Sequence, residues 1–160
     1  MEAMSGVQRL EQLPVEPRPV SLSRLGNELK ETAGLLAPAL SLSCRFPEEG
    51  WVNLDHGLFL TVAENLIANA ARFACSRMEL SLKTDNGFLM LTVADDGSGF
   101  PQELIQNGPK PFGKREGDAA HFGMGLYSSQ LLCRKHGGDL RLNNCPGATV
   151  TASFKFQGKT

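Results

Sequence analysis

The chain lacks an excess of charge of either sign. Its 16 Lys and Arg residues are balanced by 17 Asp and Glu residues, so the formal net charge is -1. This balance excludes a broad electrostatic attraction to nucleic acid or to an anionic membrane surface, and any anion site must be local. The chain also lacks an apolar run of about 20 residues, the length needed to cross a bilayer. We therefore expect a cytoplasmic domain with no direct membrane contact, within a full-length protein that can be membrane-anchored.

Paired cysteines are missing as well. The four cysteines are scattered, with no Cys-x-x-Cys pair and no histidine at zinc-ligand spacing. They are Cys44, Cys75, Cys133 and Cys145. We therefore predict reduced, partly buried thiols rather than a disulfide or zinc scaffold.

The length of 160 residues, 41% of them hydrophobic, suits one compact domain and is too short for two. Residues 1–20 contain three prolines and little apolar periodicity, which predicts a tail and a stiff linker. We place the single domain at residues 21–157.

Apolar periodicity predicts a helix from Ser21 to about Pro38, and another from His56 to Phe73 with Asp55 as its N-cap. Alternating residues predict two short strands between these helices, and a hairpin follows the second helix. The expected strand segments are 42–46, 52–54, 78–82, 88–94, 140–142 and 148–156.

Residues 97–125 hold seven of the chain's 17 glycines and show only a short helical turn near 103–106, so we predict a long functional loop or lid. A helix from about Leu126 to His136 follows, stopped by Gly137 and Gly138 in a left-handed conformation. The element order predicts an α/β fold, a two-layer sandwich with a mostly antiparallel sheet and helices on one face.

The helix 56–73 carries a polar stripe. At 100° per residue, Asn65, Asn69 and Arg72 fall within roughly 60° of one another beside the apolar side. Amide oxygens suit a hard cation such as Mg²⁺, and Arg72 adds a permanent positive charge that suits phosphate. The alternative is that both amides bond only to nearby backbone.

Asp95, at the end of a predicted strand, begins the segment Asp-Asp-Gly-Ser-Gly. Gly97 and Gly99 let the backbone approach a ligand closely, and the Asp95 carboxylate can accept a hydrogen bond from an exocyclic amine such as that of adenine. An ordinary Asp-Gly turn is the alternative.

A Gly-Met-Gly-Leu segment lies where the glycine-rich loop enters the last predicted helix. Free N–H groups at a helix start bind anions, and the glycines admit phosphate. No Gly-Lys-Ser/Thr sequence follows and no βαβ unit surrounds it, so it is neither a P-loop nor a dinucleotide fingerprint. The four residues are Gly123, Met124, Gly125 and Leu126.

Together these segments resemble the N, G1 and G2 boxes of the Bergerat-type ATPases, which include histidine kinases, gyrase-type topoisomerases, Hsp90-type chaperones and MutL-type repair proteins. The resemblance implies ATP and Mg²⁺ as cofactors in a Bergerat ATP-binding fold. It implies that Asn69 holds Mg²⁺ with Asn65 assisting, that Arg72 contacts phosphate, that Phe73 packs near adenine, that Asp95 reads the adenine amino group, and that Gly123–Leu126 border the triphosphate.

Two further segments take part in the resemblance. Phe112 is a degenerate match to the F box, and Lys114 and Arg115 are placed to reach phosphate from the lid. Residues 147–150, which include Thr149, are similar to the closing strand of histidine kinases, and we count Thr149 among the nucleotide contacts.

Asn65 indicates whether the chain resembles the hydrolytic members of this family or the kinases. Hydrolytic members carry a water-activating Glu at this position, whereas an amide lacks a basic side chain. Glu64 is one residue off, about 140° around the helix from Asn69, and is expected to face outward. Tyr127 departs from the small residue usual after the G2 leucine.

The favoured interpretation is the ATP-binding catalytic domain of a two-component sensor histidine kinase, acting in signal transduction by phosphorelay. Its partners are the histidine-containing dimerisation domain of the same kinase, for which Leu10–Leu13 suggest a helical stub, and a response regulator. None of the three histidines lies in a phosphoacceptor context, and His136 fits a C-terminal cap that complements the helix dipole. An anti-sigma-type serine kinase and a degenerate nucleotide-binding scaffold are the alternatives.

Overall fold

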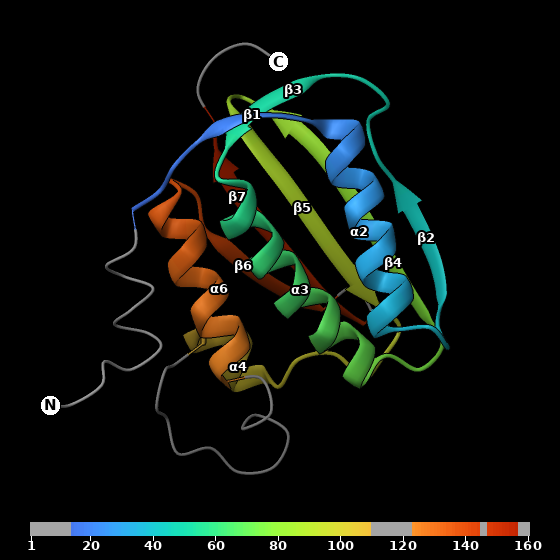
Figure 1. Cartoon of the computed structure of the whole chain (residues 1–160). Coiled ribbons are helices and arrows are strands. Elements are labelled where there is room, and N and C mark those ends of the chain that lie inside the picture. Colours follow the sequence, from blue (N-terminus) through green and yellow to red (C-terminus); the bar gives the residue numbers. More distant parts are fainter. Residues whose placement is uncertain (1–13, 110–122, 145–146, 157–160) are drawn as a thin grey trace, which may run out of the picture.

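The computed structural model describes residues 14–109, 123–144 and 147–156. A five-stranded sheet has the strand order β2-β4-β5-β7-β6, and β1 and β3 form a separate antiparallel pair. Figure 1 shows α2, α3 and α6 on one face of the larger sheet. The predicted two-layer α/β sandwich is therefore confirmed. The elements are β1 (Arg18–Ser21), α2 (Leu22–Leu36), β2 (Ser41–Arg45), β3 (Trp51–Leu54), α3 (His56–Phe73), β4 (Arg77–Asp85), β5 (Phe88–Asp95), α4 (Gln102–Asn107), α6 (Gly123–Lys135), β6 (Leu140–Asn144) and β7 (Ala148–Lys155).

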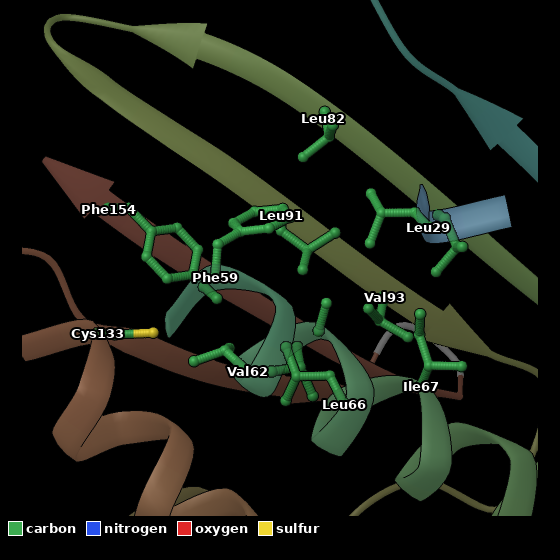
Figure 2. Packing of buried hydrophobic residues seen from close by; sticks show 14 of the residues in the cluster. Leu29, Phe59, Val62, Leu66, Ile67, Leu82, Leu91, Val93, Cys133 and Phe154 are labelled. Atoms are coloured by element: carbon green, nitrogen blue, oxygen red, sulfur yellow. The ribbon is translucent and has the colours of Figure 1, made fainter. Parts of the chain in front are cut away.

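The central strands owe their orientation to alternating side chains. In β4, β5 and β7 every second residue is buried, and those residues all belong to one hydrophobic core. Because successive side chains of a strand point to opposite faces, the intervening residues, which are mostly polar in β4 and β7, lie on the face without helices. Phe59 of α3 lies against Phe154 of β7, with ring centroids 5.2 Å apart, and Figure 2 shows this contact within the core.

The predicted bounds of α3 and its N-cap are confirmed. The Asp55 side chain accepts a hydrogen bond from the Leu58 N–H at 3.0 Å, which satisfies one of the free donors at the helix start. The hairpin of β4 and β5 is also confirmed, and its turn has positive φ at Asn86 and Gly87.

The two strands expected between the first helices do not pair with each other. β2 lies beside β4 and runs parallel to it, whereas β3 pairs with β1. The parallel arrangement arises because the chain crosses over through α3 before it re-enters the sheet at β4. All other neighbouring strands of the larger sheet are antiparallel, so the predicted mostly antiparallel character holds.

Several element boundaries differ by one to three residues from the sequence-based expectation, and β4 and β6, for example, extend to Asp85 and Asn144. Two other differences bear on how the fold is built. β1 takes Arg18–Val20, which were expected to belong to a linker, into pairing with β3. α6 begins at Gly123 rather than near Leu126, because packing against α3 outweighs the low helix propensity of glycine. Gly137 ends this helix with a φ of 82°, as expected.

Across the described ranges, no helix has the length and hydrophobicity required of a membrane span. The three cysteines that the structure describes are free, whereas Cys145 lies outside the described residues. Burial raises the pKa values of the Cys133 and Cys44 thiols, which keeps both in the protonated form.

Candidate nucleotide site

The polar stripe of α3 lies at the border between the core and solvent. Asn65 and Asn69 are half-buried and Arg72 is exposed, whereas residues on the other side of the helix belong to the core. The Asn65 amide donates from Nδ2 to the Ser129 Oγ of α6 at 3.3 Å, which turns its carbonyl oxygen away from that partner. The Arg72 guanidinium lies 5.7 Å from the centre of the Phe73 ring.

Two contacts show that α6 runs antiparallel to α3. Asn65 meets Ser129 in the middle of both helices, and Asp55 at the start of α3 donates its N–H to His136, just beyond the end of α6. Because the helices are antiparallel, Asn69, one turn after Asn65 on α3, lies beside the turn of α6 that precedes Ser129. The stripe and the first turn of α6 therefore lie at the same end of the helical layer.

The first turn of α6 contains the whole glycine-rich segment Gly123–Leu126. Its N–H groups are the ones that a helix leaves without intrahelical partners, and they carry the positive end of the helix dipole. A side-chain carbon placed on Gly125 would have no atom within 4 Å, whereas Leu126 is anchored in the core. Met124 belongs to the same turn. The segment is therefore a suitable anion site.

Asp95 ends β5 on the side of the sheet that the helices cover. Its Oδ1 accepts a hydrogen bond from the Gly97 N–H at 2.8 Å. Burial raises the pKa of Asp95, the Gly97 N–H opposes this shift, the neighbouring Asp96 charge adds to it, and the Ala148 N–H again opposes it. The result is a partly buried acceptor at the strand end, suited to an amino group.

The glycines after Asp95 are required by close contacts. A side-chain carbon on Gly97 would lie 2.2 Å from the Phe73 carbonyl oxygen, so only glycine lets this turn touch the end of α3. Gly99 has a φ of 90° and lies against the Asn144 side chain, which accepts from the Phe100 N–H at 2.7 Å. The ordinary-turn alternative accounts for the bend, but not for this contact with α3.

The structure thus joins the N-box and G1-box residues directly and brings the start of α6 to the same end of the layer. Phe112, Lys114 and Arg115, together with His121, lie outside the described residues. Their predicted roles at the lid stay predictions.

Thr149 is placed away from the other predicted contacts. It pairs with Ala94 in the sheet, and its neighbours Ala148 and Val150 are the residues that enter the core. Because side chains alternate, Thr149 faces the side without helices, where Thr92 and Thr151 place their hydroxyl oxygens 3.3 Å apart. The expectation that Thr149 borders the nucleotide is therefore wrong for this geometry, and Ala148 is the residue beside Asp95.

His136 also differs from its expected role. It is buried, and its Nε2 accepts the Asp55 N–H at 3.0 Å, which requires a neutral imidazole with the proton on Nδ1. It therefore cannot complement the helix dipole as a cation in this arrangement. Glu64 is exposed, as predicted.

Two residues that support the site, Ser129 and Asn144, were not predicted from the sequence. Ser129 is fully buried and orients Asn65, and Asn144 braces the turn after Asp95 through both of its amide atoms. The signal for Ser129 was available, because it is a polar residue at the spacing of the buried residues Leu126 and Leu132. Asn144 left no comparable pattern.

The donor set near α3 suits magnesium rather than a softer metal. Within the described ranges, no three His, Cys, Asp or Glu side chains cluster as a metal site. Mg²⁺ is commonly held by one or two protein oxygens together with substrate phosphates and water, so the Asn69 amide is a residue that could hold it next to a bound phosphate.

Comparisons with known proteins agree with this geometry. Residues 55–158 match the family model described as histidine kinase-, DNA gyrase B-, and HSP90-like ATPase. Sensor protein EvgS of Escherichia coli strain K12 is 29% identical over 149 residues, which are 86% of this chain and 12% of EvgS. Sensor protein CseC of Streptomyces coelicolor is 33% identical over 136 residues, 84% of this chain and 26% of CseC.

The fold is also found among solved structures. The mycobacterial sensor histidine kinase MprB superposes with a TM-score of 0.71 at 20% identity, covering 88% of this chain and 98% of that one. The chain spans little more than a quarter of CseC and a smaller share of EvgS, so these sensor proteins are much longer than it. The matched family model, which covers well over half of the chain, shows that the chain belongs to the histidine kinase-, DNA gyrase B- and HSP90-like ATPases and is a nucleotide-binding domain.

Proposed function

We propose that this chain is the ATP-binding catalytic domain of a sensor histidine kinase. It binds Mg-ATP in the cytoplasm and presents the γ-phosphate to a histidine on a separate dimerisation domain of the same protein. In the transfer, the bond between the γ-phosphorus and the bridging oxygen breaks, a bond to an imidazole nitrogen forms, and ADP leaves. A response regulator then receives the phosphoryl group from that histidine.

The observation that carries this proposal is the arrangement of Asn65 on α3. Its amide donates to Ser129, and an amide has no basic lone pair with which to activate water. Glu64 is exposed and so is not turned toward α6. A site built this way favours holding ATP intact until an acceptor arrives.

Each residue has a proposed role in that site. Asn69 would hold Mg²⁺, which supplies charge neutralisation at the phosphate oxygens. Arg72 and the N–H groups of the first turn of α6 would bind the phosphates, and Asp95 would accept from the adenine amino group with Phe73 packed nearby. The lid pair Lys114 and Arg115 would complete the phosphate contacts.

The alternatives receive less support. The matched relatives described above are sensor proteins, which favours a histidine acceptor over the serine acceptor of an anti-sigma-type kinase. A scaffold without catalytic function would not need the half-buried amides to be kept beside a phosphate-binding helix start.

Nucleotide titration tests the first part of the proposal. A fluorescent ADP analogue should bind more tightly with Mg²⁺ than without it, and Asn69→Ala should abolish that metal dependence. Asn27→Ala is a matched control, since Asn27 is exposed on α2, a different helix. Equal binding with and without Mg²⁺ in the unmodified domain would favour the scaffold.

Phosphoryl transfer tests the second part. The dimerisation domain of the full-length protein is added together with ATP labelled at the γ-phosphate. Label that is lost in acid but kept in base is expected on that domain, as for phosphohistidine. Label found on serine, or none in a domain that binds Mg-ADP, would refute the histidine kinase assignment while leaving nucleotide binding intact.

A further inference from the structure

The carboxylate of Asp96 lies at the centre of a group of hydrogen-bond donors just beyond the end of α3. Its Oδ1 accepts from the N–H groups of Cys75, Ser76 and Arg77 at 3.0, 2.9 and 2.9 Å. Its Oδ2 accepts from the Ser76 hydroxyl at 2.6 Å. One side chain therefore holds Cys75 and Ser76, in the segment that connects α3 to β4, together with Arg77, the first residue of β4.

These donors keep the Asp96 side chain ionised. The Arg77 N–H, then the Ser76 hydroxyl and the Ser76 N–H, hold the pKa of Asp96 well below its ordinary value. The Arg77 guanidinium adds a longer contact, with Nε 3.9 Å from Oδ2. A charged acceptor gives stronger hydrogen bonds than a neutral one, so the carboxylate is the form that this arrangement requires.

The same region has a second attachment through the backbone. The Asp96 N–H donates to the Arg77 carbonyl oxygen at 3.3 Å, and Gly97 lies so close to the Phe73 carbonyl that a side chain there would collide. Asp95, directly before Asp96, points its carboxylate to the helix-covered side of the sheet. The turn that contains Asp95 is thus held against the end of α3 that contains Phe73 by two contacts, the hydrogen bonds of Asp96 and the close approach of Gly97.

We propose that Asp96 is a positioning residue for the adenine side of the nucleotide site, fixing the separation between the Asp95 carboxylate and the Phe73 ring. The inference rests on the proposed nucleotide site. Asp96 itself touches no nucleotide in this arrangement, because its oxygens already face the donors after α3. It acts on base recognition through its neighbours.

A merely structural role predicts something different. If Asp96 only stabilises the fold, its loss lowers the thermal midpoint but leaves the affinity and base preference of the remaining folded domain unchanged. If it positions Asp95 and Phe73, its loss weakens binding of the matched base in particular. The ratio of ADP affinity to GDP affinity separates these roles.

The experiment compares Asp96→Ala and Asp96→Asn with Asp139→Ala. Asp139 is a suitable control because its carboxylate also accepts a side-chain and a backbone donor, Arg134 Nε at 3.0 Å and the Leu140 N–H at 2.8 Å, but lies at the far end of α6. Fluorescent ADP and GDP analogues are titrated at a temperature where circular dichroism shows every variant folded.

We expect Asp96→Ala to lower ADP affinity by about tenfold, the scale of one hydrogen bond to a charged group, and to lower GDP affinity less. Asp96→Asn keeps one acceptor oxygen, so its ADP affinity should lie between that of Asp96→Ala and that of the unmodified domain. Asp139→Ala should bind as the unmodified domain does. If Asp96→Ala does not fold, Ser76→Ala removes only the hydroxyl donor and should shift the affinity ratio in the same direction.

An unchanged affinity ratio in folded Asp96 variants overturns the positioning role. An unmodified domain that fails to bind ADP overturns the proposed nucleotide site instead. The two failures are therefore distinguishable in one set of titrations.

Discussion

The two ends of α3 are both polar, but their polar groups have different partners. At the N-terminal end, the Asp55 carboxylate accepts N–H groups from Leu58 and Glu16, each at 3.0 Å, and the Asp55 N–H donates to His136. His56 Nε2 lies 2.6 Å from Glu28 Oε1 of α2. These hydrogen bonds hold the start of α3 against the N-terminal segment, α2 and the residue that follows α6.

At the C-terminal end, the side chains of Asn69 and Arg72 border solvent. The hydrogen bonds that hold this end in place are made instead by Asp96, which lies outside the helix. Under the proposed function, the polar side chains of the helix are then available to a ligand. In the proposed site, one helix therefore contributes to stability at its N-terminal end and to ligand binding at its C-terminal end, which the turn containing Asp96 holds in place.

The largest expected effect concerns stability at the N-terminal end. Phe59 is fully buried against Phe154, so Phe59→Ala should lower the free energy of unfolding by about 3–5 kcal/mol, measured by urea denaturation. Trp51→Ala is the control, because Trp51 is 57% exposed and should change stability little. The nucleotide affinity of the folded Phe59→Ala protein should stay close to that of the unmodified chain. An affinity loss as large as that of Asn69→Ala would contradict the separation of roles between the two ends of α3.

A smaller loss is expected when His136 stops accepting the Asp55 N–H. His136→Phe keeps an aromatic ring beside Phe154 but leaves the N–H without its acceptor, which should cost about 1–3 kcal/mol in urea denaturation. His136→Gln restores an acceptor oxygen and should recover part of that loss. Equal stability of the two variants would mean that the hydrogen bond contributes nothing measurable.

The elements that sequence predicted well are those fixed by local rules. The helix from His56 to Phe73 needed only its N-cap and an apolar period, and the β4–β5 hairpin needed only alternation around an Asn-Gly turn. The stripe of Asn65, Asn69 and Arg72 followed from helical spacing alone.

The features that sequence did not predict depend on distant parts of the chain. The parallel pairing of β2 with β4 and the pairing of β1 with β3 are choices among remote partners, which no local pattern specifies. The motif containing Thr149 does not specify which face of the strand each residue occupies, and a shift of one residue moves a side chain to the other face. Ser129 acquires its role only where α6 meets α3.

A fall in pH should change the contributions of Asp95 and Asp96 to the free energy of unfolding in opposite directions. Asp96 has a lowered pKa when folded, so its contribution to stability is present above the unfolded value of about 4 and is lost as pH falls through the folded pKa. The pKa of Asp95 is raised, so its ionisation weakens the folded state as pH rises through the folded pKa.

Urea midpoints between pH 3 and 7 check these signs. The stability advantage of the unmodified chain over Asp96→Asn should be constant above about pH 4 and shrink as the pH falls below it, whereas Asp95→Asn should gain relative stability as the pH rises. Curves that run parallel for all three proteins would contradict both assignments.

The smallest expected effect tests the link between the two ends, the contact of Asn65 with Ser129. Ser129→Ala removes a single long hydrogen bond of 3.3 Å, so the unfolding free energy should fall by only about 0.5–1 kcal/mol. The Asn65 amide is then no longer held with its nitrogen toward α6, and its oxygen loses its fixed direction. Mg²⁺-dependent ADP affinity should therefore fall modestly, by less than in Asn69→Ala. Ser128→Ala changes the neighbouring, half-exposed hydroxyl, and identical affinities in the two serine variants would show that Asn65 needs no orientation from α6.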